Sequence, residues 1–425
     1  MSMKKYPIWA LKSKNEKRFK QGHPWVFSNE LSQTPKGIEP GDPIELRDAG
    51  GEFLAYGFGN PHSLIAFRAV TRQKDERDIF APTFIQKTLA QALKLRESQG
   101  YLHASFRWIF GEADGLPGLI LDRYLTTDDK NVFVMQAQTA GAQKMISSIV
   151  EVLSQESKTF FGASSFTLIL KNNASSRKLE GLEVMHEAEV LKKEEGLNIT
   201  DLEVWLKSSH QKEGKLPLSA DFLKGQKTGL FLDQSYNIEL FLSRFQFKKQ
   251  NIKILDLCSY VGHWSAQLGK GLSHLKPEVT LCDASEQALS FAKRNLKKLN
   301  IECITKKMDV LTEINQLKEA SYDIVICDPP ALIKGRKNIP QGKKAYFKLN
   351  QSAMKLLTPY GVLVSCSCSG ILEEKEFETL MQQAALSTKM AFSFVARGGQ
   401  SGDHPLLLEF PEGRYLKCLM GVKRD

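Results

Sequence analysis

Residues 252–263, with the sequence Ile-Lys-Ile-Leu-Asp-Leu-Cys-Ser-Tyr-Val-Gly-His, decide the fold of the carboxyl-terminal half. A short apolar strand runs into a polar turn, and a small residue opens the helix that follows. Further apolar strands are expected at 279–283, 303–306, 323–327 and 361–365. Helices are expected between them at 264–272, 286–299, 312–318 and 344–357. This alternation predicts an α/β fold with a doubly wound, mostly parallel sheet.

Ligands of such sheets bind beyond the carboxyl ends of the strands, so the turn after the first strand is the first place to examine. The turn lacks the G-x-G-x-x-G pattern, which disfavours a dinucleotide-dependent oxidoreductase. An acid at the strand end, a tight turn and a small residue opening the helix instead suit S-adenosylmethionine (SAM). The helix amino terminus offers N–H groups to a cofactor carboxylate. We therefore expect cofactor contacts from Asp256, Ser259, Tyr260 and Gly262.

Two more aspartates follow the next two strands. Asp283 is placed to bind both ribose hydroxyls, and Asp309 is placed to bind the adenine amino group. A single aspartate at a strand end more often caps a helix than binds a ligand. Three of them at successive strand ends of one sheet, Asp256, Asp283 and Asp309, favour SAM as the cofactor.

The fourth and fifth strands end in the most informative motifs of the chain. The fourth gives Asp328-Pro329-Pro330, a rigid segment in which the prolines donate no N–H group and which can hold a flat base. The fifth gives Cys366-Ser367-Cys368. The C5 carbon of cytosine is too weak a nucleophile to attack a methyl sulfonium unaided, and a thiolate that adds to C6 activates it. The alternatives are a stiff exit from the strand and two small residues that pack a strand end.

Basic residues gather in two places, in a chain with 58 Lys and Arg, 48 Asp and Glu and a net charge of +10. Such a charge suits a nucleic-acid partner. Segment 331–348 contains no acid and carries Lys334, Arg336, Lys337, Lys343, Lys344 and Lys348. A second group precedes Trp25 and comprises Lys4, Lys5, Lys12, Lys14, Lys17, Arg18 and Lys20. We expect phosphate contacts from both, although each can equally be a solvated surface.

Three domains are expected from the pattern: a small β-barrel at 1–75, a mixed α/β domain at 76–210, and the methyltransferase domain at 211–425. The seven scattered cysteines have no paired C-x-x-C spacing, which argues against a disulfide framework and a structural zinc site. No apolar run approaches the ~20 residues needed to cross a bilayer. A cytoplasmic protein that binds no membrane is therefore expected.

In these motifs the chain resembles the bacterial 23S rRNA (cytosine-5)-methyltransferases that carry an amino-terminal PUA domain. The likeness extends over nearly the whole chain, through 22–27, 41–42, 112–118, 227–234, 259–260, 328–330, 367–370, 403–405 and 412–413. It implies a PUA barrel, a small RNA-contacting domain and a Rossmann-like methyltransferase domain. It also implies 23S rRNA, or a precursor of the large subunit, as partner.

The resemblance further implies individual roles. Cys368 would be the nucleophile, and Asp328 would hold the cytosine edge. Segment 227–234 would close over cofactor and base, with Lys227 toward the RNA and Asp233 and Gln234 toward the cofactor. The oligomeric state stays open, with a homodimer as one option.

The chain also departs from the family pattern. Cys258, Val261 and His263 replace its usual residues around the first turn, which bears on cofactor affinity. Pro330 stands where many other RNA cytosine-5 methyltransferases have a second cysteine. The base that removes the C5 proton is therefore open between Asp328, His404 and water. Methylation of a guanine ring nitrogen and a non-catalytic role in ribosome assembly are the alternative functions.

Overall fold

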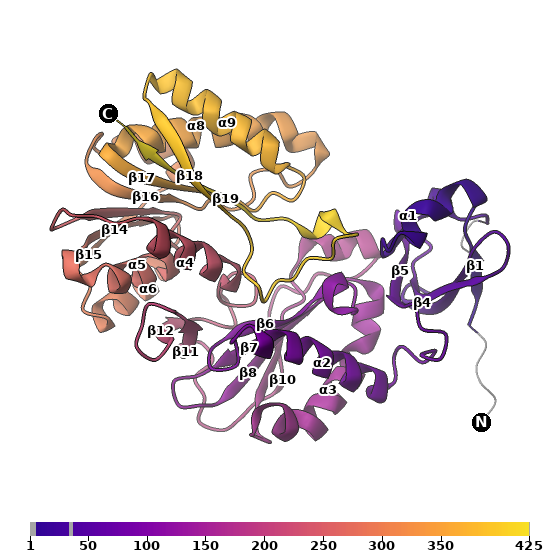
Figure 1. Cartoon of the computed structure of the whole chain (residues 1–425). Helices are drawn as coiled ribbons and strands as arrows, with labels where there is room; N and C mark the ends of the chain where they lie inside the picture. Colours follow the sequence, from indigo (N-terminus) through magenta and orange to yellow (C-terminus); the bar gives the residue numbers. More distant parts are fainter. Residues whose placement is uncertain (1–5, 34–36, 425) are drawn as a thin grey trace. The chain divides into compact units, whose positions relative to one another are not determined.

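The computed structural model describes residues 6–33 and 37–424, so Lys4 and Lys5 of the first basic group lie outside the described residues. By its internal contacts the chain forms two compact units (Figure 1). Unit 1 comprises 1–204, 221–230 and 403–413, and unit 2 comprises 205–220, 231–402 and 414–425. The predicted barrel and middle domain thus both belong to unit 1, and each unit is described separately below.

The amino-terminal part of unit 1 is a five-stranded sheet in the order β1-β3-β4-β5-β2. Its strands are β1 (Ile8–Ala10), β2 (Trp25–Phe27), β3 (Asp42–Arg47), β4 (Phe53–Gly59) and β5 (Ile65–Thr71). The short helical segments of the region are η1 (Ser13–Asn15), α1 (Glu16–Lys20) and η2 (Ser28–Glu30), which follows β2. Apolar residues on the inner face, among them Val26, Ile44 and Phe67, form its core.

A second five-stranded sheet makes up the rest of unit 1, in the order β10-β9-β8-β7-β6. It consists of β6 (Phe106–Phe110), β7 (Leu119–Leu125), β8 (Asn131–Ala137), β9 (Thr167–Leu170) and β10 (Glu189–Lys192). Helices α2 (Pro82–Ser98) and α3 (Ala140–Phe161) pack against it, and Trp108 and Phe133 lie in the shared core. Short 3-10 segments are η3 (Gly111–Asp114) and η4 (Ser175–Glu180).

Segment 403–413, from near the end of the chain, is part of unit 1. Arg96 donates to the carbonyl of Asp403 over 2.7 Å, and the Arg107 N–H donates to the Asp403 carboxylate over 2.8 Å. The Phe410 ring lies 4.6 Å from the Trp25 ring, centroid to centroid. Buried polar anchors and an aromatic contact therefore fix this segment in unit 1.

Unit 2 is built on a seven-stranded sheet in the order β15-β14-β13-β16-β17-β19-β18. The strands are β13 (Lys253–Leu257), β14 (Glu278–Asp283), β15 (Cys303–Lys307), β16 (Tyr322–Cys327), β17 (Leu357–Ser367), β18 (Phe392–Gly398) and β19 (Lys417–Lys423). The first five are parallel, and β19 is antiparallel to both β17 and β18. The strand order reverses at β13, between β14 and β16, which is where ligands of such sheets bind. The predicted fold class is confirmed.

Helices cover both faces of this sheet (Figure 1). On one side lie α4 (Ser235–Arg244), α5 (His263–Gly271) and α6 (Glu286–Lys298). On the other lie α7 (Val310–Glu313), η7 (Ile314–Gln316), α8 (Ile339–Leu356) and α9 (Glu374–Thr388). The remaining short segments of unit 2 are η5 (Leu232–Gln234), η6 (Ser273–Leu275) and η8 (Arg336–Asn338), and η9 (Pro411–Gly413) belongs to unit 1. A two-stranded sheet of β11 (Leu202–Lys207) and β12 (Lys215–Ala220) completes the fold.

Two helices differ from the prediction. The helix expected at 312–318 is a single α-turn, α7, followed by the 3-10 turn η7. Helix α8 begins at Ile339 rather than at 344, because Pro340 fits the first helical turn, where its missing N–H group costs nothing. The second half of the expected basic loop is therefore helical.

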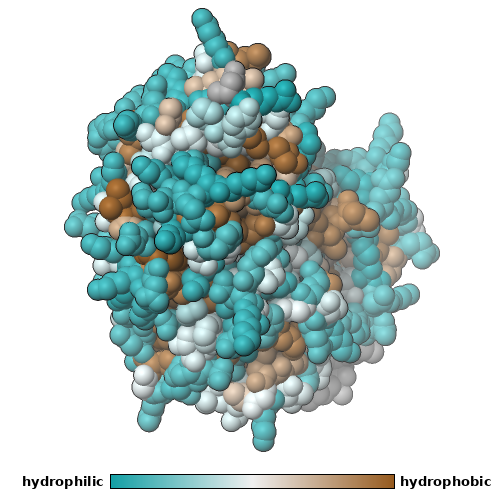
Figure 2. All heavy atoms as spheres, turned by 60° about the vertical axis from the view of Figure 1, so that its left-hand side comes forward, coloured by the Kyte–Doolittle hydropathy of each residue, from teal (hydrophilic) through white to brown (hydrophobic). Residues whose placement is uncertain are grey.

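The face seen in Figure 2 is mostly hydrophilic, and its apolar residues occur as small patches. Within 6–33 and 37–424, no helix combines the length and the apolar character that a membrane span requires.

Candidate active site

The turn after β13 has an unusual backbone. Cys258, Tyr260 and Gly262 have φ values of +63°, +49° and +84°. At Gly262 an added Cβ atom would lie 3.3 Å from the Cβ of Ala292, so both the backbone conformation and the packing against α6 favour glycine. Asn295 of α6 fixes the turn by donating to the carbonyl of Val261 over 3.0 Å.

Asp283 is held in place at the carboxyl end of β14. Its carboxylate accepts hydrogen bonds from the N–H groups of Tyr260 over 2.9 Å and Ser285 over 2.8 Å. Asp256 lies deeper and is 1% exposed, and its carboxylate accepts a bond from Ser265 of α5 over 2.7 Å. Burial, with a smaller contribution from the charges of Asp328 and Asp283, raises the pKa of Asp256 to about 7. Asp256 is therefore a buried acidic group near the carboxyl end of β13.

Asp309 is exposed and caps α7, because its carboxylate accepts from the N–H of Leu311 over 3.0 Å. This is the role that aspartates at strand ends commonly have. Its predicted contact with adenine stays a prediction.

Asp328, at the carboxyl end of β16, is oriented by a buried amide. Gln234 donates from Nε2 to Asp328 Oδ2 over 2.9 Å, and its Oε1 accepts from Asn237 over 2.7 Å. Asn237 in turn accepts from the N–H of Gly399 over 2.9 Å. The structure thus places Gln234, expected beside the cofactor, directly on the residue expected to hold the base. Its neighbour Asp233 accepts a hydrogen bond from the hydroxyl of Tyr415.

The two cysteines of the fifth strand have different surroundings. Cys366 is fully buried within β17 and pairs across the sheet with Cys418 of β19. Burial, together with a hydrogen bond to Cys418, raises the pKa of the Cys366 thiol well above its usual value. Cys368 lies just beyond the strand and is partly exposed, with Sγ 3.9 Å from the carbonyl oxygen of Pro329. The structure therefore brings Cys368 together with the Asp-Pro-Pro segment.

Two residues that sequence reasoning missed support this strand end. The hydroxyl of Tyr346 from α8 lies 2.9 Å from the hydroxyls of both Ser367 and Ser369. Lys417 of β19 is 2% exposed and donates to the carbonyl of Ser369 over 2.6 Å. The available signal for Lys417 was a lone lysine directly before an apolar run, Cys418 to Met420.

The predicted basic segment also lies in unit 2. Lys334, Arg336, Lys337 and Lys344 are exposed, which is compatible with phosphate contact. Lys343 forms an ion pair of 2.5 Å with Glu376 of α9. The expectation that no acid opposes these cations is therefore wrong at Lys343.

Trp25, Lys227 and the first basic group, for which RNA contacts are predicted, belong to unit 1. The Trp25 indole donates to Glu112 over 2.7 Å and lies under the guanidinium of Arg68, so protein groups already contact the ring. Lys227 is exposed and has a φ of +48°. In the first basic group, Arg18 pairs with Glu30, and Lys20 pairs with Glu16 and Asp48.

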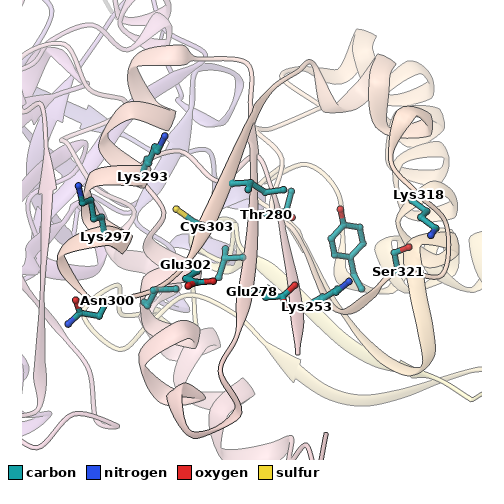
Figure 3. A pocket seen from close by; sticks show the side chains of 14 residues that line it. Lys253, Glu278, Thr280, Lys293, Lys297, Asn300, Glu302, Cys303, Lys318 and Ser321 are labelled. Carbon is teal, nitrogen blue, oxygen red and sulfur yellow. The ribbon is translucent and has the colours of Figure 1, made fainter. Parts of the chain in front are cut away.

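A large cavity of unit 2 lies elsewhere. It measures about 950 Å³ and lies at the amino ends of β13 to β16 (Figure 3). Four lysines and two glutamates line it: Lys253, Lys293, Lys297, Lys318, Glu278 and Glu302. It is thus at the opposite edge of the sheet from Cys368 and Asp328.

The residues at the carboxyl edge fit a nucleoside cofactor. Ser259 lies in the turn between β13 and α5. Its buried hydroxyl has no hydrogen-bond partner among the described residues. The carboxylate of Asp283 is fixed by two N–H groups and retains lone pairs for ribose hydroxyls. Burial lowers the pKa of His263, the first residue of α5, to about 4, so its ring is neutral at pH 7. A neutral ring there adds no charge to the cofactor site.

Fold and site together define a SAM-dependent methyltransferase. Residues 10–72 match the PUA-like domain family, and residues 231–391 match the methyltransferase small domain family. Over 98% of its length the structure superposes with a TM-score of 0.74 on all of a Streptococcus mutans protein described as a SAM-dependent methyltransferase, at 15% identity. A methyltransferase solved with bound SAH superposes equally well, with coverage of 98% of this chain and 99% of that one. The cofactor is SAM.

The sequence gives the family directly. Ribosomal RNA large subunit methyltransferase I of Aliivibrio fischeri is 32% identical, over 95% of this chain and 96% of that protein. The protein of the same name from Photobacterium profundum is 30% identical, over 96% and 97%. The chain belongs to the ribosomal RNA large subunit methyltransferase I family, which confirms the predicted relationship.

Proposed function

We propose that this protein transfers a methyl group from SAM to C5 of a cytosine in 23S rRNA, through a covalent bond between Cys368 and C6. The observation that carries the proposal is the position of Cys368, partly exposed at the end of β17 and 3.9 Å from the Pro329 carbonyl. The rRNA substrate is supported by the relatives, which are named ribosomal RNA large subunit methyltransferase I.

The reaction balances as follows. The Cys368 thiolate adds to C6, and the electron pair of the C5–C6 double bond moves toward the ring carbonyl and N3, which makes C5 nucleophilic. When bound, SAM supplies an electrophilic methyl group. C5 takes this methyl group, and the sulfonium sulfur keeps the electron pair of the broken bond. A base then removes the C5 proton, the double bond re-forms, and Cys368 leaves as thiolate.

Asp328 would hold the exocyclic amino group and N3 edge of the cytosine. Its carboxylate is oriented by Gln234, which restricts it to one geometry before the base arrives. The target base would have to leave its stack to reach this position. The exposed cations at 334–344 would contact phosphates beside it. Of the three candidates for the base that takes the C5 proton, Asp328 and water would act within unit 2, whereas His404 belongs to unit 1.

Nucleoside mass spectrometry tests the proposal. Unmodified 23S rRNA and large-subunit particles are incubated with the protein and methyl-labelled SAM, then digested to nucleosides. We expect the label in 5-methylcytosine, and none with the Cys368→Ala protein. Label in a methylguanine would establish the ring-nitrogen reaction instead. RNA binding without any label would support the role in assembly.

A further inference from the structure

Lys417 is a buried lysine with no obvious structural need for its charge. Its side chain is 2% exposed, and Nζ donates to two neutral acceptors, the carbonyls of Ser369 over 2.6 Å and Tyr415 over 2.9 Å. Burying an ammonium group is costly unless a negative charge compensates it. The neighbourhood should therefore contain an anion.

The strand register places Lys417 opposite the residue that precedes the predicted nucleophile. Lys417 is paired with Ser367 in the antiparallel β17–β19 ladder, and Cys368 is the next residue after Ser367. Nζ of Lys417 donates to the carbonyl of Ser369, which is the residue directly after Cys368. Two acidic groups, the Cys368 thiol and the Glu374 carboxyl of α9, are near enough to Lys417 to raise its pKa.

Three other titratable groups of unit 2 do not favour a thiolate at Cys368. Glu374 of α9 is 3.7 Å from Arg414 and carries a negative charge, which disfavours a thiolate. Tyr346 of α8 has a pKa raised by burial, so its hydroxyl is neutral. Asp328 follows β16, the strand that pairs with β17, and its negative charge also disfavours a thiolate.

We propose that Lys417 is the positioning residue that keeps the Cys368 thiol in its thiolate form before RNA binds, with the thiol proton released to solvent. This inference rests on the proposed function, in which Cys368 is the nucleophile. A neighbouring cation favours the thiolate, and the effect is strongest where water is excluded. The cations at 334–344 that are exposed are screened by solvent and salt, whereas Lys417 is not.

The charge state of Lys417 is compatible with this role. Burial lowers the pKa of Lys417 to about 8, and the negative charge of Cys368 opposes that fall. The ammonium form therefore predominates at pH 7. Its influence on Cys368 is present below pH 8 and is lost as the pH rises further.

The test measures the ionisation of Cys368 in the full-length protein without RNA or SAM. The protein is treated briefly with iodoacetamide between pH 5 and pH 10, and the peptide that contains Cys368 is quantified by mass spectrometry. We expect the Lys417→Met protein to show a midpoint at least about one pH unit higher than the unchanged protein, so that alkylation at pH 6.5 falls about tenfold. Lys417→Arg keeps the cation and should restore the original midpoint.

A second variant, at Glu374, covers the case in which the Lys417→Met protein does not fold. Glu374→Gln removes a partly exposed negative charge, and we expect it to lower the midpoint. Equal midpoints in the unchanged, Lys417→Met and Glu374→Gln proteins, or a Cys368 that reacts only above pH 9 in the unchanged protein, would overturn the inference. The readout is independent of methylation. Full activity of Cys368→Ala would overturn the proposed function and leave the midpoint shifts as they are.

Discussion

The two edges of the sheet in unit 2 differ in a way that volume alone does not show. The amino edge has the large cavity, about 950 Å³, but its lining lysines and glutamates come from surface positions of mixed charge. The carboxyl edge instead gathers a buried acid, Asp256, an oriented carboxylate, Asp328, and a partly exposed thiol, Cys368. The carboxyl edge is therefore the better candidate site, because its side chains orient one another, although the cavity at the amino edge is large. The predictions below test that difference, from the largest expected effect to the smallest.

The largest effect is expected at the end of β17. Cys368→Ala should lower methylation of rRNA by at least about 10⁴-fold, because no other group at that position can add to C6. Cys366→Ala is the matched control two residues away, and it should keep more than about a third of the activity because that thiol is buried against Cys418. Labelled-methyl incorporation measures both. Equal losses in the two variants would mean that the strand end, and not the thiol of Cys368, is what matters.

The amide that orients Asp328 should be next in importance. Gln234→Leu removes a hydrogen bond to a carboxylate, and we expect kcat to fall about 10- to 100-fold. Affinity for SAM, measured by calorimetry, should change less than about twofold. A large loss of SAM affinity with unchanged kcat would instead show that Gln234 binds the cofactor, as expected from the sequence.

The basic residues of the two edges give a direct contrast. Changing Lys334, Arg336 and Lys337 together to alanine should raise the KM for RNA about five- to tenfold and reduce the salt slope of binding by about 2. The matched control changes Lys293, Lys297 and Lys318 at the amino edge, and its KM should stay within about twofold. Binding measured by filter retention between 50 and 300 mM salt decides the comparison. Equal effects would make both edges part of one RNA-binding surface.

The smallest effect concerns stability. The pKa of Asp256 is raised from 3.8 to about 7, so the carboxyl group stabilises the fold below pH 4 and this contribution is lost as the pH rises through 7. Asp256→Asn keeps an acceptor for Ser265 without the charge. We expect its Tm to exceed that of the unchanged protein by roughly 3 °C or more at pH 8 and to show no gain at pH 4. Calorimetry without SAM measures it, and a lower Tm at pH 8 would contradict the assignment of an internal acid.

The fold was predictable where the sequence pattern is local. The parallel strands β13 to β17 are apolar runs separated by helical patterns, and both signals lie within a few residues. The antiparallel pair β18–β19 was not predicted, because β18 is an edge strand whose apolar residues are half exposed. Helix α8 was predicted too short, since a basic stretch before Pro340 resembles a loop.

The candidate site was predictable in part for a related reason. Residues at the carboxyl ends of parallel strands meet at one edge, so Asp283, Asp328 and the pair Cys366 and Cys368 could be named from position, while the choice of Cys368 came from the family resemblance. Lys417 and Tyr346 could not, because their neighbours depend on the β17–β19 register and on how α8 packs. The contact of Gln234 with Asp328 was not predicted, since it spans 94 residues of sequence.

The central claim, covalent catalysis by Cys368 on cytosine, is tested most directly with an RNA substrate that contains 5-fluorocytosine. Fluorine at C5 cannot leave as a proton does, so the bond between enzyme and base persists after methyl transfer. The account predicts a covalent RNA–protein complex that forms only with SAM present, with the modified nucleotide on the peptide containing Cys368. Methyl transfer to the RNA with no covalent complex, or a complex at another residue, would contradict it.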